Sequence, residues 1–155
     1  MVRKGQPIVV GIDGTDAGWR ALEWALTRAD DLQCPLRVVH VCGLDTALLP
    51  FAEHADDERR RQCEAVVLEA RRRIGAEGGV ATVELAVDEG RPSNALQERA
   101  EGVRELIVGR RAMGPVERFF VGSTSRAVIA HASLPVVVVP QHGRTPERRE
   151  VVVGV

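Results

Sequence analysis

The chain has 155 residues, enough for one domain with a hydrophobic core that needs neither a disulfide framework nor a metal for stability. Its formal net charge is −1, so no global field attracts nucleic acid or an anionic membrane. Aromatic residues make up only 3% and there is no tyrosine, which leaves few side chains to stack single-stranded nucleic acid. No apolar run resembles a signal peptide or could span a bilayer. We therefore expect a soluble, cytoplasmic protein with no nucleic-acid and no membrane partner.

The spacing of the cysteines and histidines does not indicate a disulfide framework, a metal site or a catalytic residue. Cys34, Cys42 and Cys63 are odd in number and lack the C-x-x-C pattern, so we expect neither a disulfide framework nor a zinc site. Cys34 and Cys42 flank a predicted strand, which favours buried, reduced thiols. Cys63 lies at the polar start of a helix, where nothing in the sequence supports a reactive thiol. The four histidines are scattered without an H-x-x-x-H pair, so the sequence predicts no metal site and no catalytic residue.

Hydrophobic periodicity predicts alternating strands and helices along the chain. Short apolar runs indicate buried strands at 8–12, 36–41 and 105–108, while alternation at period two places a strand at 82–87 near a sheet edge. Helices are predicted from 16 to about 28, over 57–74 up to Gly75, from Pro92 onward and over 123–132, and a last strand over 135–139. Residues 43–57 are predicted to form a long loop, either a lid or a cover for the sheet edge.

These repeated β-α units imply a mostly parallel sheet that is covered on both faces. Ligands in such sheets bind beyond the carboxyl ends of the strands, near the point where the strand order reverses. Asp13, Val41 and Gly109 all stand at predicted strand ends, so we expect the ligand to lie there.

A candidate phosphate site follows the strand at 105–108. Gly109 ends this strand, and Gly122-Ser123-Thr124-Ser125 opens the next helix. The first N–H groups of a helix lack intrahelical partners and carry the positive end of its dipole, and the hydroxyls add further donors for an anion. The same residue types also make an ordinary helix N-cap. The pattern leaves both interpretations open.

The end of the chain repeats its beginning. Residues 150–155 echo residues 7–12 after a polar stretch at 141–149. Such a repeat favours the start of a second copy in a tandem protein. An additional strand that pairs within the sheet or across a dimer explains it equally well.

Residues 7–140 resemble the universal stress protein family. The segments that carry the resemblance are Val9-Val10-Gly11-Ile12-Asp13-Gly14-Thr15, Gly90-Arg91-Pro92, Gly122-Ser123-Thr124-Ser125 and Leu134-Pro135-Val136-Val137-Val138-Val139-Pro140. The resemblance implies an α/β, flavodoxin-like (HUP-type) three-layer sandwich with a five-stranded parallel sheet in the order 3-2-1-4-5, usually in a homodimer. It places the domain at residues 5–141 and leaves 142–155 as a linker and first strand of a second repeat, or a dimer-exchanged strand.

The resemblance also implies a nucleotide site. Some members of the family bind ATP through Gly-x2-Gly-x9-Gly-Ser/Thr. In this chain the motif begins at Gly109 and ends at Gly122-Ser123 with the same spacing, but Ala112 replaces the second glycine. By the resemblance, Asp13 contacts the adenine or ribose, Val41 the adenine and Gly109 the ribose. The phosphates would be lined by Ala112, Gly122, Ser123 and Thr124. Any Mg²⁺ would be held by phosphates and water.

Two functions are therefore expected from different classes. The first is an ATP-binding regulatory protein of the stress response with at most slow hydrolysis, since no carboxylate pair or activated nucleophile is positioned for fast chemistry. The alternative is a dimeric interaction module whose phosphate site is empty, with the apolar strand from Val136 to Val139 as the dimer edge. A P-loop or receiver domain is excluded because the one lysine, Lys4, lies in the N-terminal arm.

Overall fold

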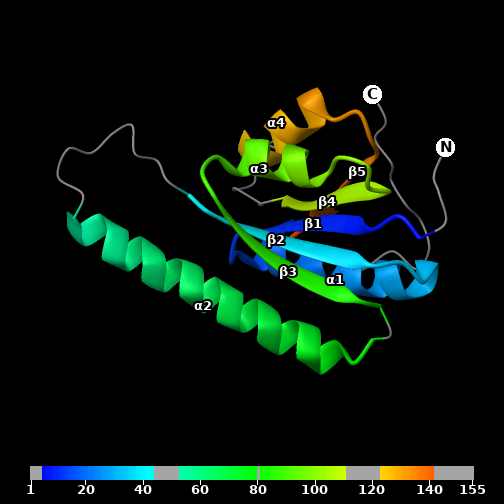
Figure 1. The fold of residues 1–155 in the computed structure, drawn as a ribbon, viewed down its shortest axis with the longest axis horizontal. Helices are drawn as coiled ribbons and strands as arrows, with labels where there is room; N and C mark the ends of the chain where they lie inside the picture. The colour runs from blue at the N-terminus through cyan, green and yellow to red at the C-terminus, as the bar shows by residue number, and fades with distance from the viewer. Residues whose placement is uncertain (1–4, 44–52, 80, 111–122, 142–155) are drawn as a thin grey trace.

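The computed structural model describes residues 5–43, 53–79, 81–110 and 123–141. Within these residues the strands form one parallel sheet in the order β3-β2-β1-β4-β5, which confirms the predicted fold class and strand order (Figure 1). The strands are β1 (Ile8–Ile12), β2 (Leu36–Cys42), β3 (Val83–Glu89), β4 (Glu105–Arg110) and β5 (Val136–Pro140). The helices are α1 (Asp16–Leu32), α2 (Glu53–Glu77), α3 (Pro92–Arg99) and α4 (Ser123–His131).

The sheet is the middle of three layers because successive strand residues point to opposite faces. On one face Ile8 and Val10 of β1 pack with the apolar side of α1 and with Ala70 of α2. On the other face Val9 packs with Leu96 of α3 and with residues of α4. Figure 1 shows α3 and α4 on one side of the sheet and α1 and α2 on the other. The central strand β1 is thus buried on both faces, as its uninterrupted apolar sequence predicts.

Helix α1 is held at both ends by local hydrogen bonds. The Thr15 hydroxyl accepts a hydrogen bond from the Gly18 N–H at 3.3 Å, which makes Thr15 the N-cap. The helix continues past the predicted end near residue 28 because Ala29 is apolar and fully buried against the core. It ends at Gln33, which adopts the left-handed conformation with φ 49°.

Helix α2 is longer than predicted at both ends. The expected loop at 43–57 is wrong over residues 53–57, which form the first turns of the helix, while residues 44–52 lie outside the described part. The polar sequence of these turns has no apolar periodicity, so hydrophobic patterning does not reveal them. At the other end the helix passes through Gly75 and stops before Gly78, whose φ of +59° is left-handed.

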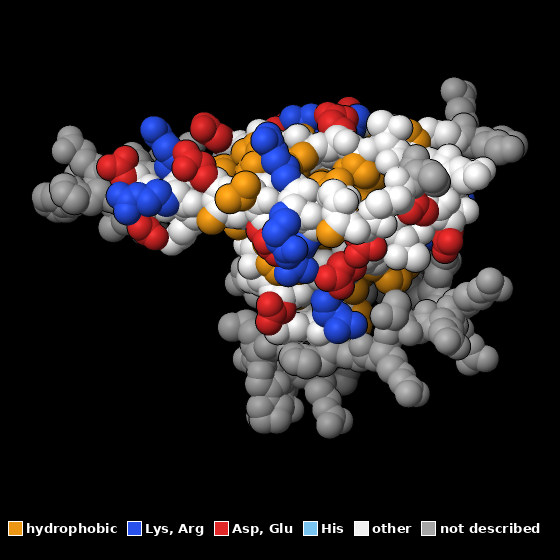
Figure 2. All heavy atoms as spheres, turned by 90° about the horizontal axis from the view of Figure 1, so that it is seen from below, with side chains coloured by type: hydrophobic (Ala, Val, Ile, Leu, Met, Phe, Trp, Pro, Cys, Tyr) orange, Lys and Arg blue, Asp and Glu red, His pale blue; other side chains and the backbone are white. Residues whose placement is uncertain are grey.

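The two edges of the sheet are β3 and β5. The edge position predicted for β3 is confirmed, and Val87 on this strand is 46% exposed. On β5, Val136 and Val139 are buried and the two valines between them are half-buried. Among the described helices none is both long and apolar enough to cross a bilayer. The face shown in Figure 2 carries basic and acidic side chains next to one another, so neither sign dominates that surface.

Candidate functional site

A pocket of about 160 Å³ opens at the carboxyl ends of β1, β2 and β4, on the face of the sheet covered by α3 and α4. Four of the residues predicted for the site line it. These are Asp13, Val41, Gly109 and Thr124. It lies where the strand order reverses between β1 and β4, which is the position expected for a ligand in this architecture. Apolar side chains that share the lining are Ile12, Val39, Pro92, Leu96 and Val108.

The other three residues predicted for the site lie wholly or partly outside the described part of the chain. Ala112 and Gly122 lie outside the described residues. Ser123 is the first residue of α4, and its side chain also lies outside the described part. Their predicted phosphate contacts therefore stay predictions.

Asp13 organises the turn between β1 and α1. Its Oδ1 accepts hydrogen bonds from the Thr15 backbone N–H at 3.0 Å and from the Thr15 hydroxyl at 2.5 Å. Asp13 does not itself cap α1, because the N-cap is Thr15. Asp13 instead orients the capping residue, and it does so from the rim of the pocket.

Gly109 has a packing role that the sequence pattern did not reveal. A Cβ at this position would collide with the backbone carbonyl of Ala17, since α1 approaches β4 closely here. At Gly11 a Cβ would instead lie 2.9 Å from the terminal methyl groups of Leu96, which can shift more easily than a backbone carbonyl. Glycine at position 109 thus permits close packing of α1 on β4 beside the pocket, so Gly109 is not a neutral site for mutation.

Ser125 ties α4 to β4. It is 5% exposed, and its hydroxyl donates a hydrogen bond to the Gly109 carbonyl at 3.1 Å. A hydroxyl has one hydrogen to donate, so Ser125 does not supply the anion donor that its position in the motif suggests. Among the described groups at the start of α4, the half-buried Thr124 and the backbone N–H groups can donate to an anion.

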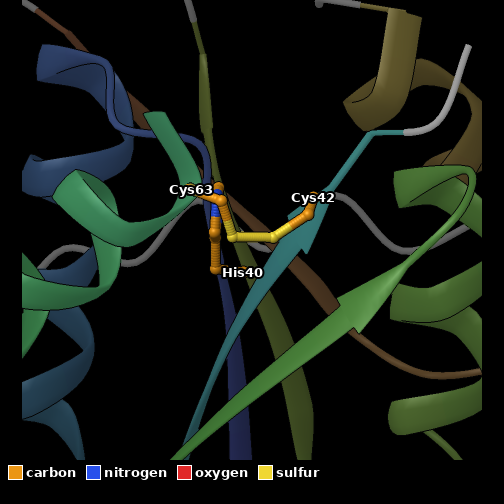
Figure 3. Close-up of side chains that lie close together, drawn as sticks. All are labelled: His40, Cys42 and Cys63. Atoms are coloured by element: carbon orange, nitrogen blue, oxygen red, sulfur yellow. A yellow bond between two sulfur atoms is a disulfide. The ribbon is translucent and has the colours of Figure 1, made fainter. Parts of the chain in front are cut away.

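A second cluster of side chains, His40, Cys42 and Cys63, lies on the opposite face of β2 (Figure 3). Cys42, the last residue of β2, forms a disulfide with Cys63 of α2. Ligand atoms of His40, Cys42 and Cys63 all lie within 4.8 Å of one another. The prediction of a buried, reduced thiol is therefore wrong for Cys42, which pairs with Cys63. Sequence spacing could not show the pairing, because the two residues are 21 positions apart and meet only through the packing of α2 on β2.

Cys34 fits the prediction of a buried thiol. It is 3% exposed and unpaired, and burial raises the pKa of its thiol, which keeps it protonated and unreactive. His40, by contrast, is buried with a specific partner: its Nδ1 lies 3.0 Å from the Ile12 carbonyl oxygen. A signal for the cluster was present in the sequence, since His40 and Cys42 are two residues apart in a strand and so share a face.

Residues 5–140 match the family model described as the universal stress protein family. The chain belongs to this family. The family match agrees with the strand order expected from the resemblance.

Curated members of the family differ in length. A universal stress protein of Thermus aquaticus is 33% identical over 136 residues, which cover 85% of this chain and 96% of the relative. Universal stress protein Rv2005c of Mycobacterium tuberculosis is 28% identical over 163 residues, covering 99% of this chain but 55% of the relative. The chain thus spans about half the length of several curated relatives it matches.

Solved structures share the fold. The universal stress protein UspA of Lactobacillus plantarum superimposes with a TM-score of 0.75 at 20% identity, covering 88% of this chain and 99% of its own, which supports the fold alone. A universal stress protein in complex with cAMP has a TM-score of 0.65 and 25% identity, with 90% and 100% coverage. The universal stress protein of Archaeoglobus fulgidus in complex with dAMP has a TM-score of 0.64 and 26% identity, with 88% and 99% coverage.

Proposed function

We propose that this universal stress protein binds an adenine nucleotide, ATP in the first instance, and acts as a regulatory protein of the stress response with at most slow ATP hydrolysis. The observation that carries the proposal is the convergence of Asp13, Val41, Gly109 and Thr124 on one pocket at the reversal of strand order. The structural relatives in complex with cAMP and dAMP support the choice of adenine nucleotides.

Different parts of the pocket lining suit the base and the ribose of a nucleotide. Val39, Val41 and Leu96 offer an apolar surface for the base, while Asp13 supplies a carboxylate near the ribose. The pocket of about 160 Å³ is smaller than the roughly 300–1,000 Å³ of typical ligand pockets, so it holds part of the ligand. The remainder would extend toward the start of α4.

The phosphates would lie against Thr124 and the first backbone N–H groups of α4, with Ala112, Gly122 and Ser123 completing that end of the site. A helix start favours phosphate because unpaired N–H groups and the helix dipole act together. Mg²⁺, when bound with ATP, would bridge phosphate oxygens and water and neutralise their charge.

The alternative function is a dimeric interaction module that binds no nucleotide. It is favoured by β5, which lies at an edge of the described sheet and carries four consecutive valines, from Val136 to Val139. A homodimer through this edge, or contact with a second universal stress protein repeat, would cover it. Both functions belong to a cytoplasmic protein in this proposal.

Calorimetry with Mg-ATP separates the two functions. Nucleotide binding predicts a dissociation constant tighter than roughly 1 mM, or about −4 kcal/mol. Val41→Trp should abolish the signal by filling the pocket. Val87→Trp, a matched change on the exposed side of β3, should leave it intact.

A second pair of variants tests the phosphate end. Thr124→Val removes one hydroxyl donor and should weaken ATP binding by about 0.5–1.5 kcal/mol, or roughly 2- to 12-fold. Thr27→Val removes a hydroxyl from the exposed side of α1 and should not change affinity. If neither Val41→Trp nor Thr124→Val weakens ATP binding, the nucleotide does not bind in this pocket.

A further inference from the structure

We propose that His40, Cys42 and Cys63 form a redox-controlled zinc site, closed as a disulfide when oxidised and able to bind Zn²⁺ when reduced. Two thiolates and one imidazole are a ligand set that zinc prefers, and three protein ligands leave the fourth position for water or another small ligand. The proposal is independent of nucleotide binding, because the cluster and the nucleotide pocket lie on opposite faces of β2.

The distances fit this ligand set. Tetrahedral zinc with Zn–S of about 2.3 Å and Zn–N of about 2.0–2.1 Å holds its ligand atoms roughly 3.5–3.8 Å apart. The ligand atoms of the three residues already lie within 4.8 Å of one another. After reduction the two sulfur atoms must separate, and a histidine nitrogen at the 4.8 Å limit must approach the sulfur atoms by about 1.3 Å. Side-chain rotation can supply these shifts without moving β2 or α2.

His40 is held as a metal-ligating histidine usually is. Its Nδ1 lies 3.0 Å from the Ile12 carbonyl oxygen, which can only accept a hydrogen bond, so Nδ1 carries the proton. The lone pair is then on Nε2. A backbone carbonyl that fixes the tautomer and orientation in this way is the common outer partner of histidine ligands to zinc. His40 is also 7% exposed, which limits competition from solvent.

The two states of the cluster interconvert by balanced chemistry. A low-molecular-weight thiol or a thioredoxin-type dithiol reduces the Cys42–Cys63 bond: two electrons and two protons pass to the cysteines, and the reductant leaves as its own disulfide. Zn²⁺ then displaces the two thiol protons as the thiolates bind. Because reducing compartments keep most protein thiols reduced, paired cysteines there are typically redox-active or metal-binding.

Zinc titration of reduced and oxidised protein, without a polyhistidine tag, tests the proposal. The reduced protein should bind one Zn²⁺ with release of two protons, read by competition with a chromophoric chelator and by the buffer dependence of the calorimetric heat. Co²⁺ should give thiolate-to-metal charge-transfer bands. The oxidised protein should bind more than roughly 100-fold more weakly, since loss of even outer-shell partners costs about 10–100-fold. Excess Mg²⁺ should not compete, because it prefers oxygen ligands.

Three variants locate the site. Cys63→Ser and His40→Gln should each lower zinc affinity by at least the same factor. Cys34→Ala, which alters the buried thiol outside the cluster, should leave it unchanged. Where His40→Gln fails to fold, the charge-transfer bands of the wild-type Co²⁺ complex and their loss in Cys63→Ser still decide the matter. Equal zinc affinity in the two redox states, retention in Cys63→Ser, or loss in Cys34→Ala overturns the proposal.

Discussion

Reducing the Cys42–Cys63 disulfide should destabilise the protein by about 3 kcal/mol. The bond joins the end of β2 to α2 across a sequence separation of 21 residues. In the chain-entropy model a crosslink lowers the entropy of the unfolded chain by about 2.1 + 1.5R ln n cal/mol/K. With n near 21 this gives about 11 cal/mol/K, or about 3 kcal/mol at 25 °C. The bond thus contributes a sizeable share of the 5–15 kcal/mol typical of a domain.

Urea unfolding of metal-free protein, with and without a strong phosphine reductant and with a chelator present, measures this effect. The midpoint should fall on reduction while the slope with urea stays nearly constant. Cys63→Ser should unfold at the same midpoint with or without reductant, and Cys34→Ala should respond as the wild type does. An unchanged midpoint on reduction of the wild type would refute the assignment of the disulfide to the native state.

The remaining predictions concern the scaffold. Arg28→Met should cost about 3 kcal/mol, because it leaves the buried Glu105 carboxylate without the guanidinium that contacts it at 3.0 Å; the double variant with Glu105→Met should recover most of the loss in urea unfolding. Gly14→Ala should lower the free energy of unfolding by about 1–3 kcal/mol, because the residue has φ +79° and an added Cβ would collide with a valine side chain of α2. Gly75→Ala should raise it by about 0.5–1 kcal/mol, because this helical position has open space for a Cβ. Hydrogen bonds from two arginines of α2 lower the pKa of Glu69 from 4.5 to about 2, so its stabilising contribution is complete above pH 4.5 and is lost as the pH falls through 2. A carboxyl titration of Glu69 by NMR with a midpoint near 4.5 would contradict that contact.

The strands were predictable because their signal is short-range. Parallel strands buried on both faces are continuous apolar runs, and β1 is an example whose bounds agree with the prediction. The ends of the helices were less predictable. Residues 53–57 of α2 are polar and lack periodicity, and Gly75 is tolerated inside a helix because its cost is only about 1 kcal/mol.

The candidate site also has features that the sequence predicts and features that it does not. Asp13, Val41 and Gly109 follow strands, and topology alone brings strand ends together. The use of Ser125 to bind the Gly109 carbonyl depends on how α4 packs, which a motif does not specify. The contact between β2 and the Cys63 turn of α2 is likewise a product of tertiary packing, so the spacing of the cysteines gave no sign of it.

The central claim is that an adenine nucleotide occupies the pocket between β1, β2 and β4. An NMR titration of isotope-labelled protein with Mg-ATP tests it most directly, because each backbone amide reports its own surroundings. We predict that the largest saturable shifts fall at Asp13, Val41, Gly109 and Thr124. Shifts confined to β5, or no shifts at millimolar ATP, would contradict the claim.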